Sequence, residues 1–227
     1  MSESLMSESL SSCAREIVLV RHAETEWSRD GRHTGRTDIP LTDHGRTAAR
    51  AAAARLTGRR FQLVLSSPSR RARETCELCG LDGDARTREE LLEWDYGAYE
   101  GLTTAQIEAM RPGWSLWRDG CPGGESPAEV GARADRLIAE LRAFHGDVAV
   151  FSHGHTLRVL GARWIELAPS LGARLRLSTG AICVLGYEHA TTALSCWNDA
   201  GGEPVPEATD RRPAVPPPVS SERANSS

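Results

Sequence analysis

Three short apolar runs, each ending in a cluster of polar residues, constrain the fold of this chain more than any other feature. They cover residues 17–20, 61–65 and 147–151. Runs of this length predict buried strands, although periodicity alone does not distinguish them from helix segments. Helix signals follow each run. Strands that alternate with helices predict an α/β fold: a three-layer sandwich whose mostly parallel central sheet carries helices on both faces.

Capping and stop signals place the helices between these strands. Thr42 or Asp43 can cap one helix, and Ser126 forms a capping box with Glu129 at the start of another. The predicted helices cover residues 43–56, 69–79, 104–110, 126–144 and 156–167. Residues 85–88 predict an edge strand, and residues 181–187 and 193–197 a hairpin at the sheet edge. Segment 24–41 is long enough to indicate a functional loop, and segment 111–125 has too much Gly and Pro for regular structure.

The length of 227 residues suits one domain, which we place at residues 15–200. Residues 1–14 carry a direct polar repeat and predict a disordered leader, and the Pro-rich residues 201–227 predict a disordered tail. No run is long enough to span a bilayer. The six scattered cysteines indicate free thiols in a reducing, cytoplasmic setting. Cys76 and Cys79 are interpreted as structural, with half a zinc site or a redox pair as the alternative.

The charged residues limit the function. The net charge is −4, which argues against nucleic-acid and membrane partners. All 27 basic residues other than His are Arg. Without Lys, neither Schiff-base chemistry nor a Walker-type phosphate loop is available.

Polar residues at the three strand ends predict a common pocket, which Glu93 joins from a fourth region. The clusters are Arg21 and His22, residues 67–71, and residues 153–155. Arg side chains and helix N-termini favour a doubly charged anion, and phosphate is the obvious candidate. Solvated surface residues are the alternative for Arg70, Arg71 and Arg73. A neutral imidazole is a competent nucleophile toward phosphorus, and a carboxyl group can protonate the departing alkoxide.

With these residues in view, the chain resembles the histidine phosphatase superfamily, also called phosphoglycerate mutase-like. The resemblance covers about residues 16–200 and rests on four motifs in the family's order. They are Arg-His-Ala-Glu-Thr at 21–25, Ser-Pro-Ser-Arg-Arg-Ala-Arg-Glu-Thr at 67–75, Leu-Leu-Glu at 91–93 with Gly97 and Glu100-Gly101, and Ser-His-Gly at 152–154.

The resemblance implies a phosphoglycerate mutase-like fold and a role for each matching residue. His22 would be the nucleophile that becomes phosphohistidine, and Glu93 the proton donor. Arg21, Arg71 and His153 would hold the phosphoryl group, and the register of the second motif selects Arg71 over Arg70. Ser28, Thr34, the backbone near Gly35, Gly154 and His155 would contact substrate, with a supporting or solvated role as the alternative for His155.

The resemblance favours the phosphatase branch, which includes acid phosphatases and sugar bisphosphatases. Pro-Gly-Gly-Glu-Ser at 122–126 is typical of small-molecule phosphatases, and Ala23, Ser28 and Ser69 depart from the mutase pattern. We therefore expect a phosphatase that hydrolyses small phosphomonoesters, with no metal and no cofactor. A phosphoglycerate mutase and a non-catalytic phosphoanion-binding module are the alternatives. Trp114 and Trp117 are expected to line the substrate or to pack in the core, and a homo-oligomer remains open.

Overall fold

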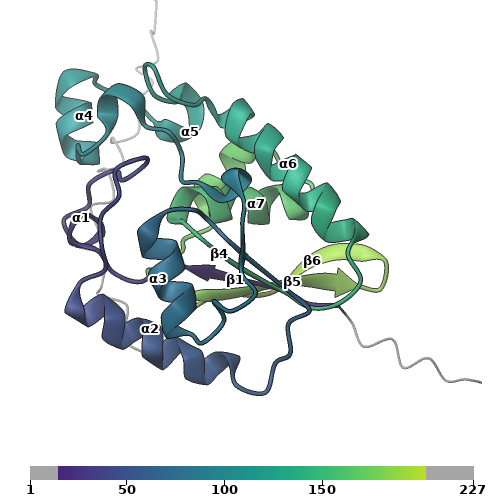
Figure 1. The fold of residues 1–227 in the computed structure, drawn as a ribbon. Helices are drawn as coiled ribbons and strands as arrows, with labels where there is room; N and C mark the ends of the chain where they lie inside the picture. Colours follow the sequence, from purple (N-terminus) through teal and green to yellow (C-terminus); the bar gives the residue numbers. More distant parts are fainter. Residues whose placement is uncertain (1–14, 203–227) are drawn as a thin grey trace, which may run out of the picture.

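The structure is a computed structural model that describes residues 15–202. The predicted leader and nearly all of the predicted tail lie outside the described residues. Within them, a single six-stranded sheet has the order β3-β2-β4-β1-β5-β6. Figure 1 labels β4, β1, β5 and β6 of this sheet. The strands are β1 Ile17–Arg21, β2 Leu63–Ser66, β3 Arg86–Thr87, β4 Val148–Ser152, β5 Ile182–Glu188 and β6 Thr191–Asp199.

The sheet is mostly parallel, as predicted. Strand β4 runs parallel to its two neighbours β1 and β2, and β3 runs parallel to β2. Strand β5 instead pairs antiparallel with both β1 and β6. The β5–β6 hairpin closes one edge, which confirms the predicted hairpin. The four parallel strands therefore end at one edge of the sheet, where the predicted polar clusters lie.

The helices follow the predicted caps. They are α1 Glu26–Arg29, α2 Asp43–Leu56, α3 Arg70–Leu78, α4 Thr104–Met110, α5 Leu116–Asp119, α6 Pro127–Ala143 and α7 Gly154–Trp164, with 3₁₀ turns at Glu89–Leu91, Gly97–Tyr99 and Pro169–Arg174. The hydroxyl of Thr42 accepts the N–H of Gly45, and Ser126 forms the predicted capping box with Glu129.

Two short helices correct the sequence analysis. Segment 111–125 contains α5, and the long loop 24–41 contains α1. Each is four residues long, and local bonds hold it: Thr25 and Ser28 form a capping box on α1, and the Asp119 carboxylate accepts the N–H of Ser115 before α5. Helices this short leave no periodic apolar pattern in the sequence.

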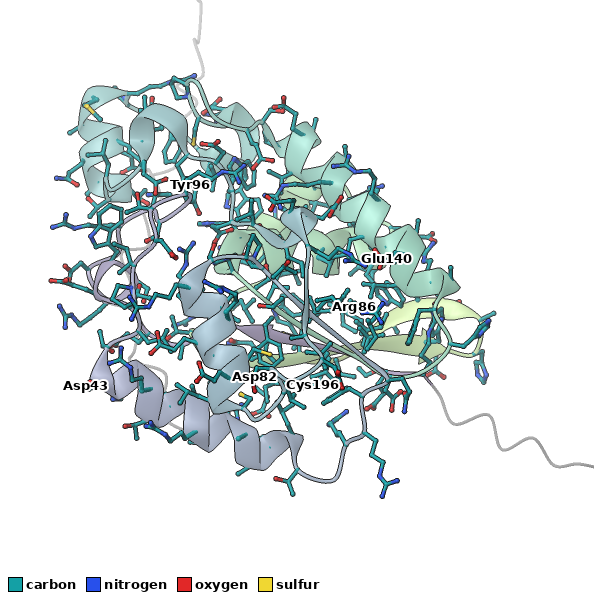
Figure 2. The ribbon with its side chains drawn as sticks, in the orientation of Figure 1. Asp43, Asp82, Arg86, Tyr96, Glu140 and Cys196 are labelled. Carbon is teal, nitrogen blue, oxygen red and sulfur yellow. The ribbon has the colours of Figure 1, made fainter. Side chains whose placement is uncertain are left out.

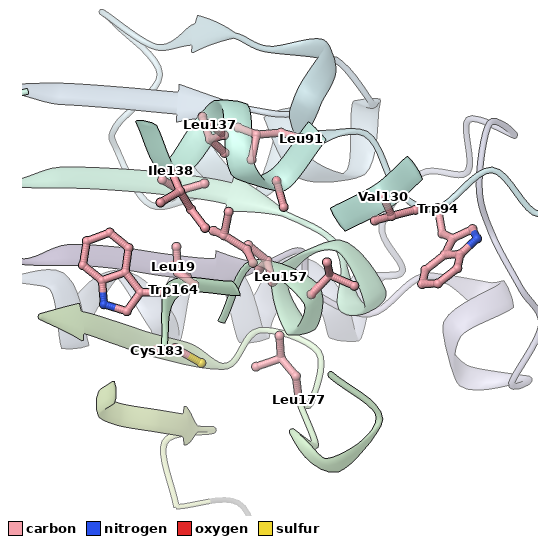
Figure 3. Packing of buried hydrophobic residues seen from close by; sticks show 14 of the residues in the cluster. Leu19, Leu91, Trp94, Val130, Leu137, Ile138, Leu157, Trp164, Leu177 and Cys183 are labelled. Carbon is pink, nitrogen blue, oxygen red and sulfur yellow. The ribbon is translucent and has the colours of Figure 1, made fainter. Parts of the chain in front are cut away.

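Alternate residues of β1 divide the core between the two faces of the sheet. Ile17 and Leu19 pack in a cluster with residues of α6 and α7, and Figure 3 shows Leu19 and Leu137 among its members. Val18 and Val20 pack on the other face with residues of α2 and α3. Because successive side chains of a strand point to opposite faces, this division follows from the apolar run itself. Helices therefore cover both faces of the sheet, as predicted.

The cysteines contribute to packing. The five that lie within residues 15–202 are all free thiols. Cys76 is buried on the α3 side of the sheet, and Cys79 packs against the same cluster. Burial raises the pKa of the Cys76 thiol to about 12 and that of Cys79 to about 11, so both are protonated and unreactive at neutral pH. Across the described part of the chain, no helix has the length and apolar character needed to cross a membrane.

Candidate active site

The sheet register brings three predicted clusters together. Arg21 pairs with Ser152, and Ser66 pairs with Phe151, so β1, β2 and β4 end at the same level. Residues at the ends of β1 and β4 border a cavity of about 210 Å³, whereas the residues that follow β2 do not line it. Seven of the predicted site residues line it: Arg21, His22, Ser28, Thr34, Glu93, Gly154 and His155. Arg71, His153 and Gly35 do not line it.

His22 is buried, and one of its ring nitrogens is hydrogen-bonded to the backbone. Its Nδ1 lies 2.7 Å from the carbonyl oxygen of Ala23. Because a carbonyl only accepts hydrogen bonds, Nδ1 must carry the proton, and Nε2 keeps a free lone pair. Burial, and then the charges of Arg71 and Arg21, hold the pKa of His22 well below its usual range. The imidazole is therefore neutral at neutral pH, which is the form a nucleophile needs.

Arg21 provides cationic donors at the cavity. One of its Nη1 hydrogens bonds the carbonyl of Leu177. Its Nε is buried and has no hydrogen-bond partner within residues 15–202. A buried donor without a partner is costly, and an anion in the cavity would satisfy it. A Cβ on Gly154 would lie 3.1 Å from the guanidinium carbon, so glycine lets α7 begin close to Arg21.

Arg71 is fully buried at the start of α3. Its Nε donates to Nδ1 of His153 at 3.1 Å. Its remaining bonds, at 3.0 to 3.1 Å, go to the carbonyls of Thr34, Gly35 and Thr37. Four of its five N–H groups are therefore used within the protein.

The two neighbouring arginines, Arg70 and Arg73, differ from Arg71 in their exposure to solvent. Arg70 is exposed, with 57% of its side chain accessible, and Arg73 is exposed as well. The surface alternative thus holds for Arg70 and Arg73, and Arg71 is the one that the fold turns inward.

His153 lies behind His22. Their ring centroids are 5.2 Å apart at an angle of 61°. Nδ1 of His153 accepts from Arg71, so its Nε2 carries the proton and donates to the hydroxyl of Ser67 at 2.7 Å. Burial, followed by the charge of Arg71, lowers the pKa of His153 well below its usual range. Ser67, His153 and Arg71 thus form a hydrogen-bonded row beside the cavity.

Glu93 lies at the N-terminus of α7, with 5% of its surface exposed. Its Oε1 accepts the backbone N–H of Trp94 and of Thr156, both at 2.9 Å. Its Oε2 accepts the N–H of His155 at 3.1 Å and points to the same helix end. The free N–H groups of a helix start favour a carboxylate there, so the fold fixes the orientation of this side chain.

The loop before α2 contains the other predicted phosphate contacts. Ser28 and Thr34 line the cavity. The N–H of Gly35 instead donates to both carboxylate oxygens of Glu100, at 2.9 and 3.0 Å. A Cβ at Gly35 would lie 2.6 Å from Glu100 and 2.7 Å from the Trp94 carbonyl. The structure therefore gives Gly35 a close-packing role and leaves its N–H unavailable to the cavity.

His155 lines the cavity and is held by aromatic neighbours. Its Nδ1 lies 2.6 Å from the hydroxyl of Tyr96. Its ring stacks on that of His33, with centroids 6.1 Å apart, and contacts Trp117 at 5.3 Å. Burial lowers the pKa of His155 well below its usual range, so it too is neutral at neutral pH.

Sequence reasoning missed seven of the residues that line the cavity, among them His33, Tyr96 and Arg158. Figure 2 labels Tyr96, on the same side of the molecule as α4 and α5. Arg158 lies four residues after Gly154 and thus on the same face of α7, a spacing that could have predicted it. Its guanidinium lies 4.5 Å from the Trp117 ring centre, and burial lowers its pKa to about 10, so it remains a cation.

Trp114 is buried in the core, and the half-buried Trp117 packs against it. Trp114 is 5% exposed and belongs to the core, and its Nε1 donates to the carbonyl of Gly120. Trp117 packs behind His155 and Arg158, and neither indole lines the cavity. Of the two expectations, core packing is the one that the structure supports.

No group of three or more His, Cys, Asp or Glu side chains that could hold a metal ion occurs in residues 15–202. Neutral imidazoles, arginine donors and a carboxylate share one cavity at the carboxyl ends of parallel strands. Together, the fold and this site define a class of α/β protein that handles phosphate groups without a Lys or a phosphate-binding Gly loop.

Comparison with known proteins identifies the family. Residues 17–200 match the histidine phosphatase superfamily, branch 1, and the chain belongs to this family. The acid phosphatase of Mycobacterium tuberculosis is 44% identical over 184 residues, which cover 79% of this chain and 90% of that protein. Sedoheptulose 1,7-bisphosphatase of Saccharomyces cerevisiae is 35% identical over 66% of this chain and 67% of its own length.

The solved structure of an open reading frame from Mycobacterium tuberculosis superposes with a TM-score of 0.77 at 42% identity. The match covers 81% of this chain and 97% of that one. Phosphoglycerate mutases of the superfamily are also similar, at 33% identity. The similarity to phosphatases at 44% and 35% identity makes this chain a phosphatase and does not favour the mutase alternative.

Proposed function

We propose that this phosphatase hydrolyses small phosphomonoesters, sugar phosphates or similar compounds, through a phosphohistidine intermediate on His22. One observation carries the proposal: the Ala23 carbonyl fixes the proton on Nδ1 of a neutral, buried His22. Nε2 is thereby presented as a nucleophile beside Arg21 and Glu93, which line the same cavity.

In the first step, Nε2 of His22 attacks phosphorus and the bond from phosphorus to the ester oxygen breaks. The carboxyl group of Glu93 gives a proton to the departing alkoxide in this step. The Nε–H of Arg21, which has no partner within residues 15–202, donates to a phosphoryl oxygen and stabilises its negative charge. The products of this step are the alcohol, phosphohistidine and the Glu93 carboxylate.

In the second step, water attacks the phosphohistidine and the bond from phosphorus to nitrogen breaks. The Glu93 carboxylate takes a proton from this water, which restores its acid form and releases phosphate. The three backbone N–H groups around Glu93 keep its carboxyl in place through both steps.

The proposal gives Arg71 and His153 a place around the phosphoryl oxygens. Their present acceptors are neutral: the carbonyls of Thr34, Gly35 and Thr37 for Arg71, and the Ser67 hydroxyl for His153. A phosphoryl dianion is a stronger acceptor than any of these, so it can exchange with one of them.

The substrate class rests on the cavity and on the relatives. Arg158, His33 and Tyr96 add polar groups to a cavity of about 210 Å³, which suits a small, hydrophilic ester. Relatives of this chain are an acid phosphatase and a sugar bisphosphatase. We further propose that residues 15–200 act as one phosphatase domain in a cytoplasmic setting, which the five free thiols support.

The test is phosphate release from sugar phosphates, sugar bisphosphates and phosphoglycerates in the presence of a chelator. We compare wild type, His22→Ala and His44→Ala, because His44 is exposed on α2. Release by wild type and His44→Ala that is lost in His22→Ala is expected. Interconversion of phosphoglycerates without release of phosphate would indicate a mutase. The absence of any turnover by wild type would indicate a non-catalytic anion-binding module. Loss of activity with the chelator would contradict a metal-free mechanism.

A further inference from the structure

The Pro-Gly-Gly-Glu-Ser segment at 122–126 has no part in the proposed reaction, although it lies directly against the segment that contains Glu93. The N–H of Glu125 donates to the carbonyl of Asp95 at 2.9 Å, and the indole of Trp94 donates to the carbonyl of Glu125 at 2.8 Å. A Cβ on Gly124 would lie 2.2 Å from the Asp95 carbonyl. The two backbones therefore approach as closely as glycine allows.

Glu125 forms a two-point ion pair with Arg133 of α6. The oxygens of Glu125 lie 2.8 and 3.1 Å from Nε and Nη2 of Arg133. Arg133 is 7% exposed, so water screens this pair little. Arg133 also donates from Nη1 to the carbonyls of Glu90 and Leu92, both at 2.8 Å.

These contacts enclose Glu93 from both sides along the chain. Arg133 holds the carbonyls of residues 90 and 92, and Oε2 of Glu125 accepts the N–H of Asp95 at 2.8 Å. Nη2 of Arg133 also donates to the hydroxyl of Thr156 at 3.3 Å, and Thr156 bonds Oε1 of Glu93 through its own N–H. The ion pair thus fixes both the backbone that carries Glu93 and the helix start that orients its carboxyl.

We propose that Glu125 and Arg133 are positioning residues for proton transfer by Glu93. The proposal rests on the proposed function, in which Glu93 protonates the leaving oxygen. A displacement of Glu93 by about an ångström can cost about a hundredfold in rate. Such a loss depends on the leaving group, because a good leaving group departs without needing a proton.

The experiment compares kcat/KM for an alkyl phosphate and for p-nitrophenyl phosphate. The ratio kcat/KM includes the phosphorylation of His22 but excludes the later hydrolysis. The variants are Glu93→Gln, Glu125→Gln and Arg133→Lys. Arg163→Met is the matched control, since Arg163 of α7 forms a similar two-point pair with Asp135 of α6, at 2.8 and 3.1 Å. Folding of every variant is checked by circular dichroism and thermal unfolding.

We expect Glu125→Gln to lower kcat/KM roughly 100-fold for the alkyl phosphate and less than about 5-fold for p-nitrophenyl phosphate. Glu93→Gln should show the same selectivity for the alkyl phosphate. Arg163→Met is expected to change kcat/KM by the same factor for the two substrates. If Glu125→Gln lowered kcat/KM equally for the two substrates while Glu93→Gln still affected mainly the alkyl phosphate, the positioning role would be overturned. Equal losses in Glu93→Gln itself would overturn the acid role of the proposed function, and the positioning role with it. If Glu125→Gln fails to fold, the same comparison in Arg133→Lys decides.

Discussion

The Nε of Arg71 in α3 donates a 3.1 Å hydrogen bond to Nδ1 of His153 at the end of β4, and the other nitrogens of Arg71 reach the loop before α2. The same guanidinium bonds three carbonyls of that loop, so one buried cation orders two walls of the site. The bond also fixes the tautomer of His153, since Nδ1 accepts and Nε2 must then donate to Ser67.

Arg71→Lys is expected to lower kcat/KM by about 100-fold or more. A single ammonium cannot reproduce a planar fork that reaches His153 and three carbonyls at once. The control is Arg70→Lys, because Arg70 is exposed and forms only a surface pair with Glu74. A change within about 2-fold is expected there, since exposed pairs contribute little. Similar losses in the two variants would refute the inward role of Arg71.

Gly45→Ala tests the packing that connects the loop after β1 to α2. A Cβ there would lie 2.2 Å from the carbonyl oxygen of Glu24, a backbone atom that cannot move aside independently. We expect a loss of about 1–3 kcal/mol in the free energy of unfolding, measured in urea. Gly83→Ala is the control, because nothing lies within 4 Å of its Cβ position. Equal stability of the two variants would show that the loop is not held this closely.

The free energy of unfolding should fall as the pH drops below about 6.5, the ordinary pKa of histidine in an unfolded chain. Burial lowers the folded-state pKa of His22, His153 and His155 well below that value. Unfolding therefore takes up protons in this range, and stability present above pH 6.5 is lost as the pH falls toward the folded pKa values.

Burial lowers the pKa of His33 as well, so the folded-state titration of His33 adds to this loss in the same direction. Urea unfolding between pH 8 and pH 5.5 measures it. His155→Gln removes one of these groups and should reduce the loss of stability between pH 8 and pH 5.5. A free energy that stays constant from pH 8 to pH 5.5 would mean that these imidazoles titrate normally in the folded protein.

The sequence was sufficient to predict the convergence of the site. Arg21, Ser67 and His153 each follow a strand, and parallel strands end at one edge, so their meeting follows from fold class alone. The inward orientation of Arg71 followed only from the motif register, since helix periodicity places Arg70, Arg71 and Arg73 equally well on the first turns of α3.

Contacts that depend on side-chain packing could not be predicted from the sequence. The pairing of the Gly35 N–H with Glu100 joins residues 65 positions apart, and no local pattern marks it. The same is true of Tyr96 against His155 and of Arg133 against the carbonyls around Glu93. These depend on how two loops dock onto α6 and α7, which strand and helix signals do not specify.

Detection of a phosphoryl group on His22 tests the central claim most directly. The protein is mixed with p-nitrophenyl phosphate, quenched within milliseconds in alkali, where phosphohistidine persists, and mapped by mass spectrometry. The account predicts an acid-labile phosphoryl adduct on His22 in wild type and in His44→Ala, and neither adduct nor turnover in His22→Ala. Turnover that persists in His22→Ala, or an adduct on another residue with His22 unmodified, would contradict it.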